Sequence, residues 1–269
     1  MPTTPPAVST IIPTFRRPRE LEEAVRSVLA QEIPLEIWVI DDSPEKSARA
    51  IVEVINDPRV NYLAMEKPTG GVPGLVRNLG LGHARGELLH FLDDDDIVPR
   101  GWYRRALARF EREPKLAALF GRVLPFGTDE AALAHEHHYF EKAARRARLC
   151  AKAGGFALAS MQSFVQTMLV CSAGLFRRAA VVEVGGFDAE VRLVEDVDLY
   201  ARIFQRYPAA FVDEATVHYR IGPSLMHSRH TGDPIGRSYI HMHARYRREL
   251  GRARFLALKL FARTVLRAA

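Results

Sequence analysis

The sequence contains few cysteines, which argues against a disulfide-stapled protein. Only Cys150 and Cys171 occur among the 269 residues, and they do not form the Cys-x-x-Cys spacing of a structural zinc site. Small secreted domains that depend on disulfides carry a much denser cysteine framework. We therefore expect a chain that folds around a hydrophobic core in a reducing compartment.

Long apolar runs are missing as well. No stretch approaches about 18 uninterrupted apolar residues, which is the length that a helix needs to cross a bilayer. Residues 1–8 lack the positively charged start and the apolar stretch of a secretory signal peptide. We therefore expect a cytoplasmic protein, whose contact with a membrane would be peripheral and at the inner face.

The chain shows neither an internal repeat nor a low-complexity linker. Its length and its 48% hydrophobic content suffice for one core, or for one domain with a small added lobe. The formal net charge of +6 suits an anionic partner, such as nucleotide phosphate or a lipid surface. Because no DNA- or RNA-binding motif is present, we expect no nucleic-acid partner.

Short apolar runs alternate with helical patterns in the first third of the chain. Strands are predicted at residues 8–12, 35–40, 60–63 and 88–92. Helices are predicted at about 18–29, at about 45–55, and from the glycine-rich loop 70–74 to about residue 84. This order predicts an α/β fold with a mostly parallel sheet and helices on both faces.

The remainder of the chain is less regular. It is predicted to hold a strand at 117–123, a helical insert at about 129–165, a helix at 195–207 and basic helix from about Pro234. We accordingly expect one domain over residues 1–234 and a basic amphipathic helical segment over residues 235–269.

Polar side chains follow three of the predicted strands. Thr14 follows the first strand, Asp41 and Asp42 follow the second, and Asp93–Asp96 follows the fourth. In open parallel sheets, ligands bind beyond the carboxyl ends of the strands. We therefore expect these three clusters to converge on one crevice.

The Asp93–Asp96 run places four carboxylates side by side after a buried strand. Their repulsion is unfavourable unless a cation compensates it. Mg²⁺ or Mn²⁺ would do so, because these ions take oxygen ligands and bridge carboxylates to substrate phosphates. The ion would also offset the charge that develops on a leaving diphosphate. The alternative is a solvated acidic turn that caps the helix after Pro99.

Two acidic pairs have a functional and a structural interpretation. Asp41 and Asp42 can accept hydrogen bonds from a base or a ribose, or they can form an ordinary Asp-Ser-Pro turn. Asp196, beside Glu195 at a predicted helix start, can act as the general base for an attacking hydroxyl. The helix N-terminus is expected to keep it ionised. Alternatively, both residues only complement the helix dipole.

Seven segments, spread over about residues 8–220, form an ordered set of motifs. They are residues 8–15, 27–31, 36–43, 77–80, 86–99, 185–188 and 195–199. Each segment is weakly specific, but the ordered set resembles the family 2 glycosyltransferases, which have the GT-A fold. The resemblance implies inverting, metal-dependent transfer of a sugar from a nucleoside-diphosphate sugar to an acceptor hydroxyl, in the synthesis of a glycan, glycolipid or glycosylated metabolite.

The same resemblance implies roles for individual residues. A nucleotide-binding half is expected over about residues 1–125 and an acceptor half over about 126–234. The donor is expected to contact Thr14, Asp41, Asp42, Arg77, Asp93 and Asp94. Mn²⁺ or Mg²⁺ is expected on the D-x-D pair of Asp93 and Asp95, with Asp95 favoured as the direct ligand and Asp96 extending the cluster. Asp196 corresponds to the catalytic base.

Downstream of the base, the match to the family is less complete. Related folds often supply a histidine as a further metal ligand; His218 is the candidate, with His227 and His230 as rivals. Gly222 stands where the family's Tyr-Arg-x-His run has its histidine, and a lone histidine is more often structural. Arg220 is expected to contact the diphosphate, since a guanidinium suits that geometry.

Two further segments are histidine-bearing or basic. His135, His137 and His138 lack the helical spacing of an H-E-x-x-H metal site, so a surface or acceptor-side helix is expected. Residues 237–267 carry an apolar stripe beside arginines. Such a helix can lie on an anionic membrane, or it can pack on its own domain or on a second subunit in a homo-oligomer. Packing is favoured over contact with a membrane.

Two other functions stay as alternatives. A nucleotidyltransferase on a similar sheet would use the same acidic metal chemistry, but the loop after Thr14 contains no glycine and the N-terminal region has no lysine-bearing glycine signature. A non-enzymatic basic binding protein would concentrate its positive charge, whereas the arginines here are spread over several predicted helices.

Overall fold

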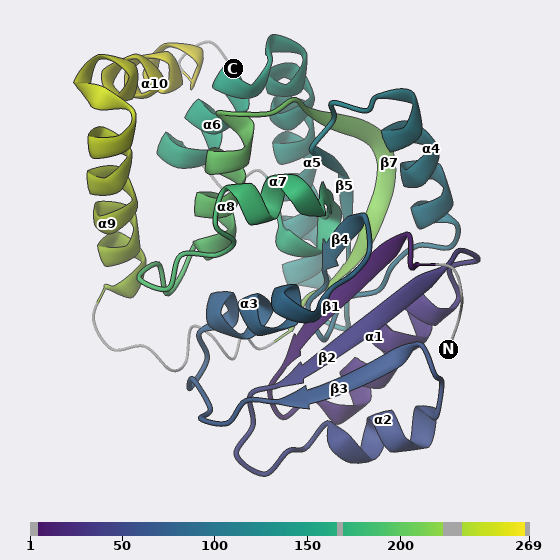
Figure 1. Cartoon of the computed structure of the whole chain (residues 1–269). Coiled ribbons are helices and arrows are strands. Elements are labelled where there is room, and N and C mark those ends of the chain that lie inside the picture. The colour runs from purple at the N-terminus through teal and green to yellow at the C-terminus, as the bar shows by residue number, and fades with distance from the viewer. Residues whose placement is uncertain (1–4, 166–168, 223–232, 267–269) are drawn as a thin grey trace.

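A computed structural model describes residues 5–165, 169–222 and 233–266 of the chain. The strands are Val8–Thr14 (β1), Leu35–Asp41 (β2), Val60–Ala64 (β3), Leu88–Phe91 (β4), Ala118–Phe126 (β5), Gly174–Arg177 (β6) and Ala209–Arg220 (β7). They form a seven-stranded sheet in the order β3-β2-β1-β4-β6-β5-β7 (Figure 1). β6 is antiparallel to both of its neighbours, and the other pairings are parallel. The predicted α/β fold with a mostly parallel sheet is confirmed.

Helices cover both faces of this sheet. One face carries Pro18–Leu29 (α1), Arg49–Ile55 (α2) and Trp102–Arg112 (α4). The other face carries Pro73–His83 (α3), Glu130–Ala153 (α5), Gly155–Phe164 (α6), Arg178–Glu183 (α7) and Glu195–Phe204 (α8). In α1, the buried residues fall at the helical spacing that predicted the element: Leu21, Ala24, Val25 and Val28.

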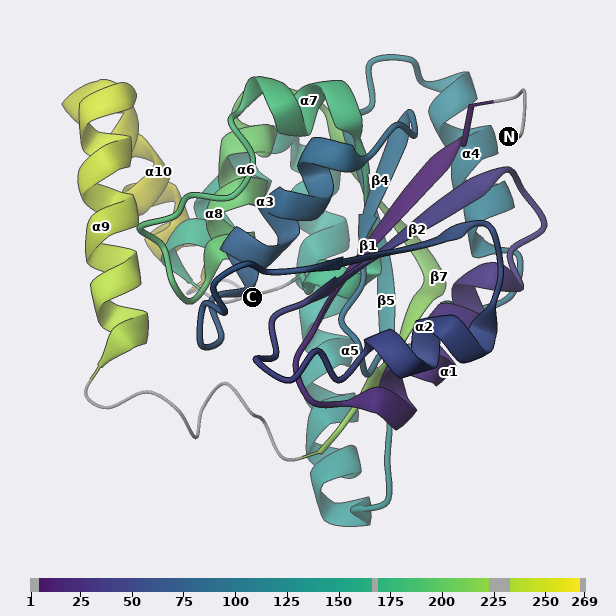
Figure 2. The ribbon, with the colours of Figure 1, turned by 60° about the horizontal axis from the view of Figure 1, so that its bottom comes forward.

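The last two helices pack against the same body. They are Pro234–Glu249 (α9) and Gly251–Leu266 (α10), which lie beside α6 and α8 (Figures 1 and 2). Met242 and Tyr246 of α9 are buried against α8, and Leu258 and Ala262 of α10 are buried as well. The predicted packing of the C-terminal stripe on its own domain is confirmed. Peripheral membrane contact, a homo-oligomer and a domain boundary near residue 234 stay predictions.

Three elements differ from the sequence patterns. No pattern predicts β7, because a register shift opposite Phe120–Arg122 interrupts its alternation. α2 begins at Arg49 rather than near Glu45, because residues 43–48 form a turn around the Asp41 carboxylate. The predicted insert is two helices, divided at Gly154, whose φ of +96° favours glycine.

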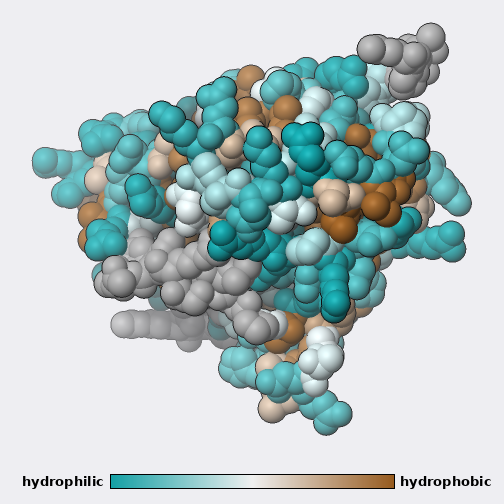
Figure 3. All heavy atoms as spheres, turned by 90° about the horizontal axis from the view of Figure 1, so that it is seen from below, coloured by the Kyte–Doolittle hydropathy of each residue, from teal (hydrophilic) through white to brown (hydrophobic). Residues whose placement is uncertain are grey.

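The described part of the chain holds no membrane-spanning helix. Among residues 5–165, 169–222 and 233–266, no helix is long and apolar enough to cross a bilayer. The face seen from below is mainly hydrophilic, with hydrophobic residues in small separate patches (Figure 3).

Candidate active site

The acidic loop, residues 93–96, follows β4 at the carboxyl end of the sheet, and its carboxylates are buried to different degrees. Asp96 is completely buried and Asp94 nearly so. The Asp93 side chain is 35% exposed and that of Asp95 is 21% exposed. The loop is therefore not a solvated turn, because two of its carboxylates are in the interior. Asp93 and Asp95 are the two that face the outside.

Asp94 joins the acidic loop to the end of β1. Thr14 Oγ1 donates a hydrogen bond to Asp94 Oδ2 at 2.7 Å, and Arg17 forms ion pairs with both Asp94 and Asp95. Burial and then the charge of Asp95 raise the pKa of Asp94 to about 7. Thr14 and Asp94 lie together as predicted, but they bind one another. The sequence patterns did not single out Arg17, although it is a cation within three residues of Thr14.

Arg77 connects the acidic loop to the start of α8. Its Nη2 atom lies 2.6 Å from Asp93 Oδ1, and its Nη1 atom lies 2.5 Å from Glu195 Oε1. The guanidinium also lies over the ring of Phe187, 5.5 Å from its centroid. The Arg77 and Glu195 side chains are only 4% and 5% exposed, so their ion pair is shielded from water, whereas the pair with Asp93 is partly exposed. One buried cation therefore brings residues 93 and 195 together across the sheet.

Asp196 follows this contact directly. It lies half-buried in the first turn of α8, next to Glu195, which is buried. Burial and then the charge of Glu195 raise the pKa of Asp196 to about 7. Ionisation of Asp196 by the helix N-terminus stays a prediction. A carboxyl group with this pKa exchanges a proton near neutral pH.

The backbone before α8 is strained. Val194 precedes the helix with φ 61° and ψ 26°, in the left-handed region that β-branched residues rarely adopt. Such conformations cost of order 1–3 kcal/mol and persist where the surrounding structure imposes them. The strain lies directly beside the predicted base, at the turn that delivers Glu195 to Arg77.

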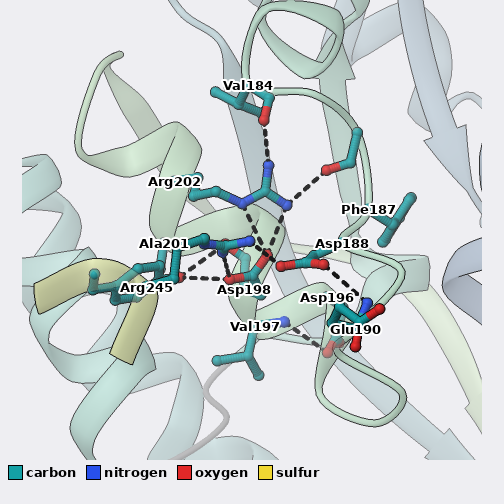
Figure 4. A network of polar contacts seen from close by, with 12 residues as sticks. Val184, Phe187, Asp188, Glu190, Asp196, Val197, Asp198, Ala201, Arg202 and Arg245 are labelled. Atoms are coloured by element: carbon teal, nitrogen blue, oxygen red, sulfur yellow. Dashed lines mark hydrogen bonds and ion pairs between the residues drawn. The ribbon is translucent and has the colours of Figure 1, made fainter. Parts of the chain in front are cut away.

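An ionic network holds α8 on the side of α9. Asp198 is fully buried and accepts a hydrogen bond from Arg202 Nε at 2.8 Å and one from Tyr246 Oη at 3.0 Å. Arg245 of α9 forms ion pairs with both Asp198 and Asp188. Figure 4 shows Asp198 between the two guanidinium groups, with Asp196 at the start of the same helix. The C-terminal helices thus fix the element that carries the predicted base.

The two carboxylates after β2 are engaged by the chain itself. Asp41 accepts hydrogen bonds from the backbone and side chain of Ser43, from the Ala48 amide and from Tyr62 Oη. This geometry is that of a turn after β2, in line with the structural alternative. Asp42 accepts from the Thr69 amide at 2.6 Å and from Thr69 Oγ1 at 2.7 Å, and so ties the glycine-rich loop before α3 to the sheet.

His218 lies next to the acidic loop through its backbone. Its amide donates to Ile97 O at 2.8 Å and its carbonyl accepts from Ile97 N at 3.0 Å. The imidazole lies edge-on to the Phe126 ring at 6.5 Å. In the described residues, His218 thus reaches the segment after the acidic loop through its backbone, and a role of its imidazole as a metal ligand stays a prediction. His227 and His230 lie outside the described residues.

Arg220 supports the acidic loop from β7. Its amide donates to Asp96 Oδ1 at 3.0 Å, and its Nε atom donates to the Asp95 carbonyl at 2.9 Å. Its Nη2 atom lies 2.5 Å from Glu23 Oε2 of α1. The guanidinium is therefore committed to contacts within the protein, and diphosphate binding by Arg220 stays a prediction.

A divalent ion would have two protein carboxylates available. Among the described residues, no three His, Cys, Asp or Glu side chains are arranged to hold a metal. Mg²⁺ is usually held by one or two carboxylates, with water and substrate phosphates as its other ligands. Asp93 and Asp95 fit that pattern, since they are the exposed members of the loop. His135, His137 and His138 lie exposed on α5, as expected for a surface helix.

Comparisons with known proteins agree with this architecture. The family model "Glycosyl transferase family 2" matches residues 9–185. The chain is 36% identical over 105 residues to the succinoglycan biosynthesis protein ExoO of Rhizobium meliloti, which covers 39% of this chain and 30% of that protein. It is 27% identical over 218 residues to the minor teichoic acid biosynthesis protein GgaB of Bacillus subtilis, covering 79% and 23%. The chain thus spans less than a third of the length of these relatives.

Among solved structures, the chain is similar to TarS of S. aureus. The structure of TarS 1–349 in complex with UDP has a TM-score of 0.65 at 17% identity and covers 94% of this chain and 69% of that chain. The complex with UDP-GlcNAc has a TM-score of 0.63 at 18% identity, covering 88% and 64%. At this identity, the likeness shows that the two share the GT-A fold.

Proposed function

The chain belongs to glycosyl transferase family 2, and from this premise we propose that it transfers a sugar from a nucleoside-diphosphate sugar to a hydroxyl group of an acceptor. TarS structures with UDP and with UDP-GlcNAc support a nucleotide sugar as the donor. The relatives named above are a succinoglycan biosynthesis protein and a minor teichoic acid biosynthesis protein, which supports an acceptor that carries hydroxyl groups.

The contact of Arg77 with both Asp93 and Glu195 carries this proposal. It places an acidic loop suited to a cation and a diphosphate beside the helix start that presents Asp196. A transferase needs these two functions close together, because the leaving group and the attacking hydroxyl act at the same carbon. A fold that kept the two clusters apart could not carry out a single displacement.

In the proposed reaction, the acceptor oxygen forms a bond to the anomeric carbon of the sugar as the bond from that carbon to the diphosphate oxygen breaks. Asp196 takes the proton of the acceptor hydroxyl, and the nucleoside diphosphate leaves with the electron pair. A single displacement of this kind inverts the anomeric carbon and needs no covalent intermediate. A base with a pKa near 7 suits this role, because it is ionised and still basic near neutral pH.

We also propose that Mg²⁺ or Mn²⁺ takes part, held by Asp93 and Asp95. When bound, the ion supplies positive charge against the diphosphate. Burial raises the pKa of Asp95, Arg17 lowers it and the charge of Asp93 raises it again, so the loop gathers negative charge that a bound cation would offset. Arg17 and Arg77 now pair with these carboxylates and would share them with the ion.

The proposal is tested by the variant Asp196→Asn, which keeps the shape of the side chain but cannot accept the proton. We expect release of UDP from a panel of UDP-sugars, with methyl glycosides as acceptors, to fall by about 10² to 10⁴-fold. UDP binding by calorimetry should be unchanged.

Asp213→Asn, an exposed residue paired with Arg148, is the matched control and should behave like the wild type. Wild-type turnover by Asp196→Asn would remove that residue from its role, and release of pyrophosphate would favour a nucleotidyltransferase.

A further inference from the structure

A cavity lies between α5 and the end of β7, on the acceptor half of the chain. Its volume is about 300 Å³, and its wall includes Glu136, Tyr139 and Phe140 of α5 and Tyr219 of β7. Ligand pockets commonly enclose about 300 to 1,000 Å³, so this one has room for a single small ring. Figure 2 shows α5 running alongside β5 and β7.

Three of the residues that line the cavity are aromatic: Tyr139, Phe140 and Tyr219. The rings of Tyr139 and Phe140 meet edge to face with centroids 5.1 Å apart, and those of Phe140 and Tyr219 meet in the same way at 5.5 Å. Phe140 is buried with Val123 and Val217, so the cluster has a rigid base. A sugar ring presents a face of C–H groups that packs on aromatic surfaces, while its hydroxyl groups point outward.

Glu136 supplies a polar group to this aromatic wall. It is half-buried, and among the described residues it forms no ion pair or hydrogen bond that would use its carboxylate. An unpaired carboxylate in a partly dry site is unfavourable without a donor, and a hydroxyl group forms a strong, short hydrogen bond to it.

The charge of the cavity selects against an anionic ligand. Arg220 also lines the cavity, but its guanidinium is engaged by Glu23 and by the Asp95 carbonyl. Within the part of the chain that the structure describes, the Glu136 carboxylate thus has no ion-pair partner. A phosphate would be repelled there, and a plain alkyl chain would leave the carboxylate without a donor.

The cavity is joined to the acidic loop. Arg220 both lines the cavity and donates its amide hydrogen to Asp96. On the other side, Val170 lines the cavity two residues before Ser172, whose Oγ accepts from the Asp93 amide at 3.0 Å. Burial, followed by the charges of the acidic loop and Glu136, raises the pKa of Tyr219, as expected for a hydroxyl lying between the two. A ligand in the cavity would therefore lie beside the acidic loop.

We propose that this cavity binds a neutral sugar ring of the acceptor, which packs on Tyr139, Phe140 and Tyr219 and donates hydroxyl hydrogen bonds to Glu136. Assigning this ring to the acceptor rests on the proposed function, whereas binding of a sugar ring in the cavity does not. The cavity thus gives the acceptor a chemical class: a hydroxylated, uncharged ring.

Saturation-transfer NMR on the full chain, without nucleotide, tests this proposal. The probes are the methyl glycosides of glucose, galactose, mannose and N-acetylglucosamine at millimolar concentration. We expect saturation of the ring protons of at least one probe by the wild type. The signal should fall at least fivefold in Glu136→Gln and in Tyr139→Ala. The control Glu130→Gln, at an exposed position of the same helix, should match the wild type.

Three results overturn the proposal: no probe is saturated, or the two cavity variants keep the wild-type signal, or the control loses it equally. Melting temperatures and UDP binding of each variant identify any loss caused by unfolding; in that case Tyr139→Phe, which keeps the ring, must restore the signal for the proposal to stand. If the wild type binds glycosides but neither binds nor turns over UDP-sugars, the proposed function fails and the sugar site stands. If UDP-sugars are turned over but no glycoside binds, the cavity proposal fails alone.

Discussion

Arg77 contacts a carboxylate on each side of the site. The Asp93 and Glu195 carboxylates both depend on it, and Glu195 is buried with it. Removing one partner of a buried ion pair leaves an uncompensated charge, which typically costs about 3–5 kcal/mol. We therefore expect Arg77→Met to lower the free energy of unfolding in urea by about that amount. Arg77→Lys keeps the positive charge but loses the two-pronged guanidinium, so its free energy of unfolding should lie between those of the wild type and Arg77→Met. Equal stability of all three proteins would show that the contact is not a structural support.

The pKa of Asp196 predicts the pH dependence of the reaction. A base with a pKa of about 7 is protonated and inactive below that pH and ionised above it. We expect kcat/KM for UDP-sugar turnover to fall about tenfold per unit of pH below 7 and to level off above it. Asp94 has a similarly raised pKa, so Asp94→Asn is the control. Its kcat/KM profile should keep the same midpoint pH as the wild type, even if the rates themselves are lower. A flat profile between pH 5 and 8.5 would contradict the assignment of Asp196 as the base.

At the scale of residues, the sequence predicted the groups of the site better than their partners. Asp93–Asp96 and Asp196 stand out because acidic clusters at strand and helix ends have a recognisable spacing. Arg17 and Arg245 do not stand out, because each is one of many arginines, and its contact is set by the packing of distant segments. The raised pKa of Asp196 was missed for a related reason: burial is a property of the folded chain.

α8 depends on α9 for its position. Arg245 of α9 joins Asp198 to Asp188, and Val194 is held in a strained conformation at the start of α8. We expect Arg245→Met to lower the unfolding free energy by about 1–3 kcal/mol, the cost of leaving a buried polar group with fewer partners. The value of kcat should fall while UDP affinity and KM for the donor change little, since the base moves and the donor half does not.

Arg245→Lys should restore part of the lost kcat, because its charge can still reach one carboxylate. Arg248→Met is the matched control, because Arg248 lies exposed on the same helix. If Arg245→Met lowered stability but left kcat unchanged, the network would be structural and unrelated to the base.

At the scale of elements, the sequence predicts helices and strands with a regular hydrophobic pattern, but it does not predict those whose pattern is interrupted. α1 shows a buried face at helical spacing and was placed correctly from the sequence. β7 was missed because its pairing with β5 contains a register shift at Gly121, where a Cβ atom would lie 2.2 Å from Thr216 Cγ2. α2 begins later than its sequence pattern predicts, because the side chain of Asp41 accepts the backbone amide hydrogens of Ser43 and Ala48.

At the scale of the whole molecule, the metal and the nucleotide should stabilise the fold together. A ligand that binds only the folded chain raises its stability by RT ln(1 + [L]/Kd), or about 2.7 kcal/mol at a hundred times Kd. We expect UDP with Mn²⁺ to raise the melting temperature by several degrees and UDP with EDTA to raise it much less. Asp95→Asn should lose most of the metal-dependent part, and Asp213→Asn should keep it. Equal shifts with and without the ion would count against the metal proposal.

The position of Arg245 along the chain has a consequence for how the protein is made. Chains emerge from the ribosome from the N-terminus, and the early segments begin to fold first. β1 to β4 and the acidic loop lie in the first part of the chain, whereas the partner that fixes α8 arrives with α9. During synthesis, the segment expected to hold the donor is therefore complete before the base that would use it is locked in place.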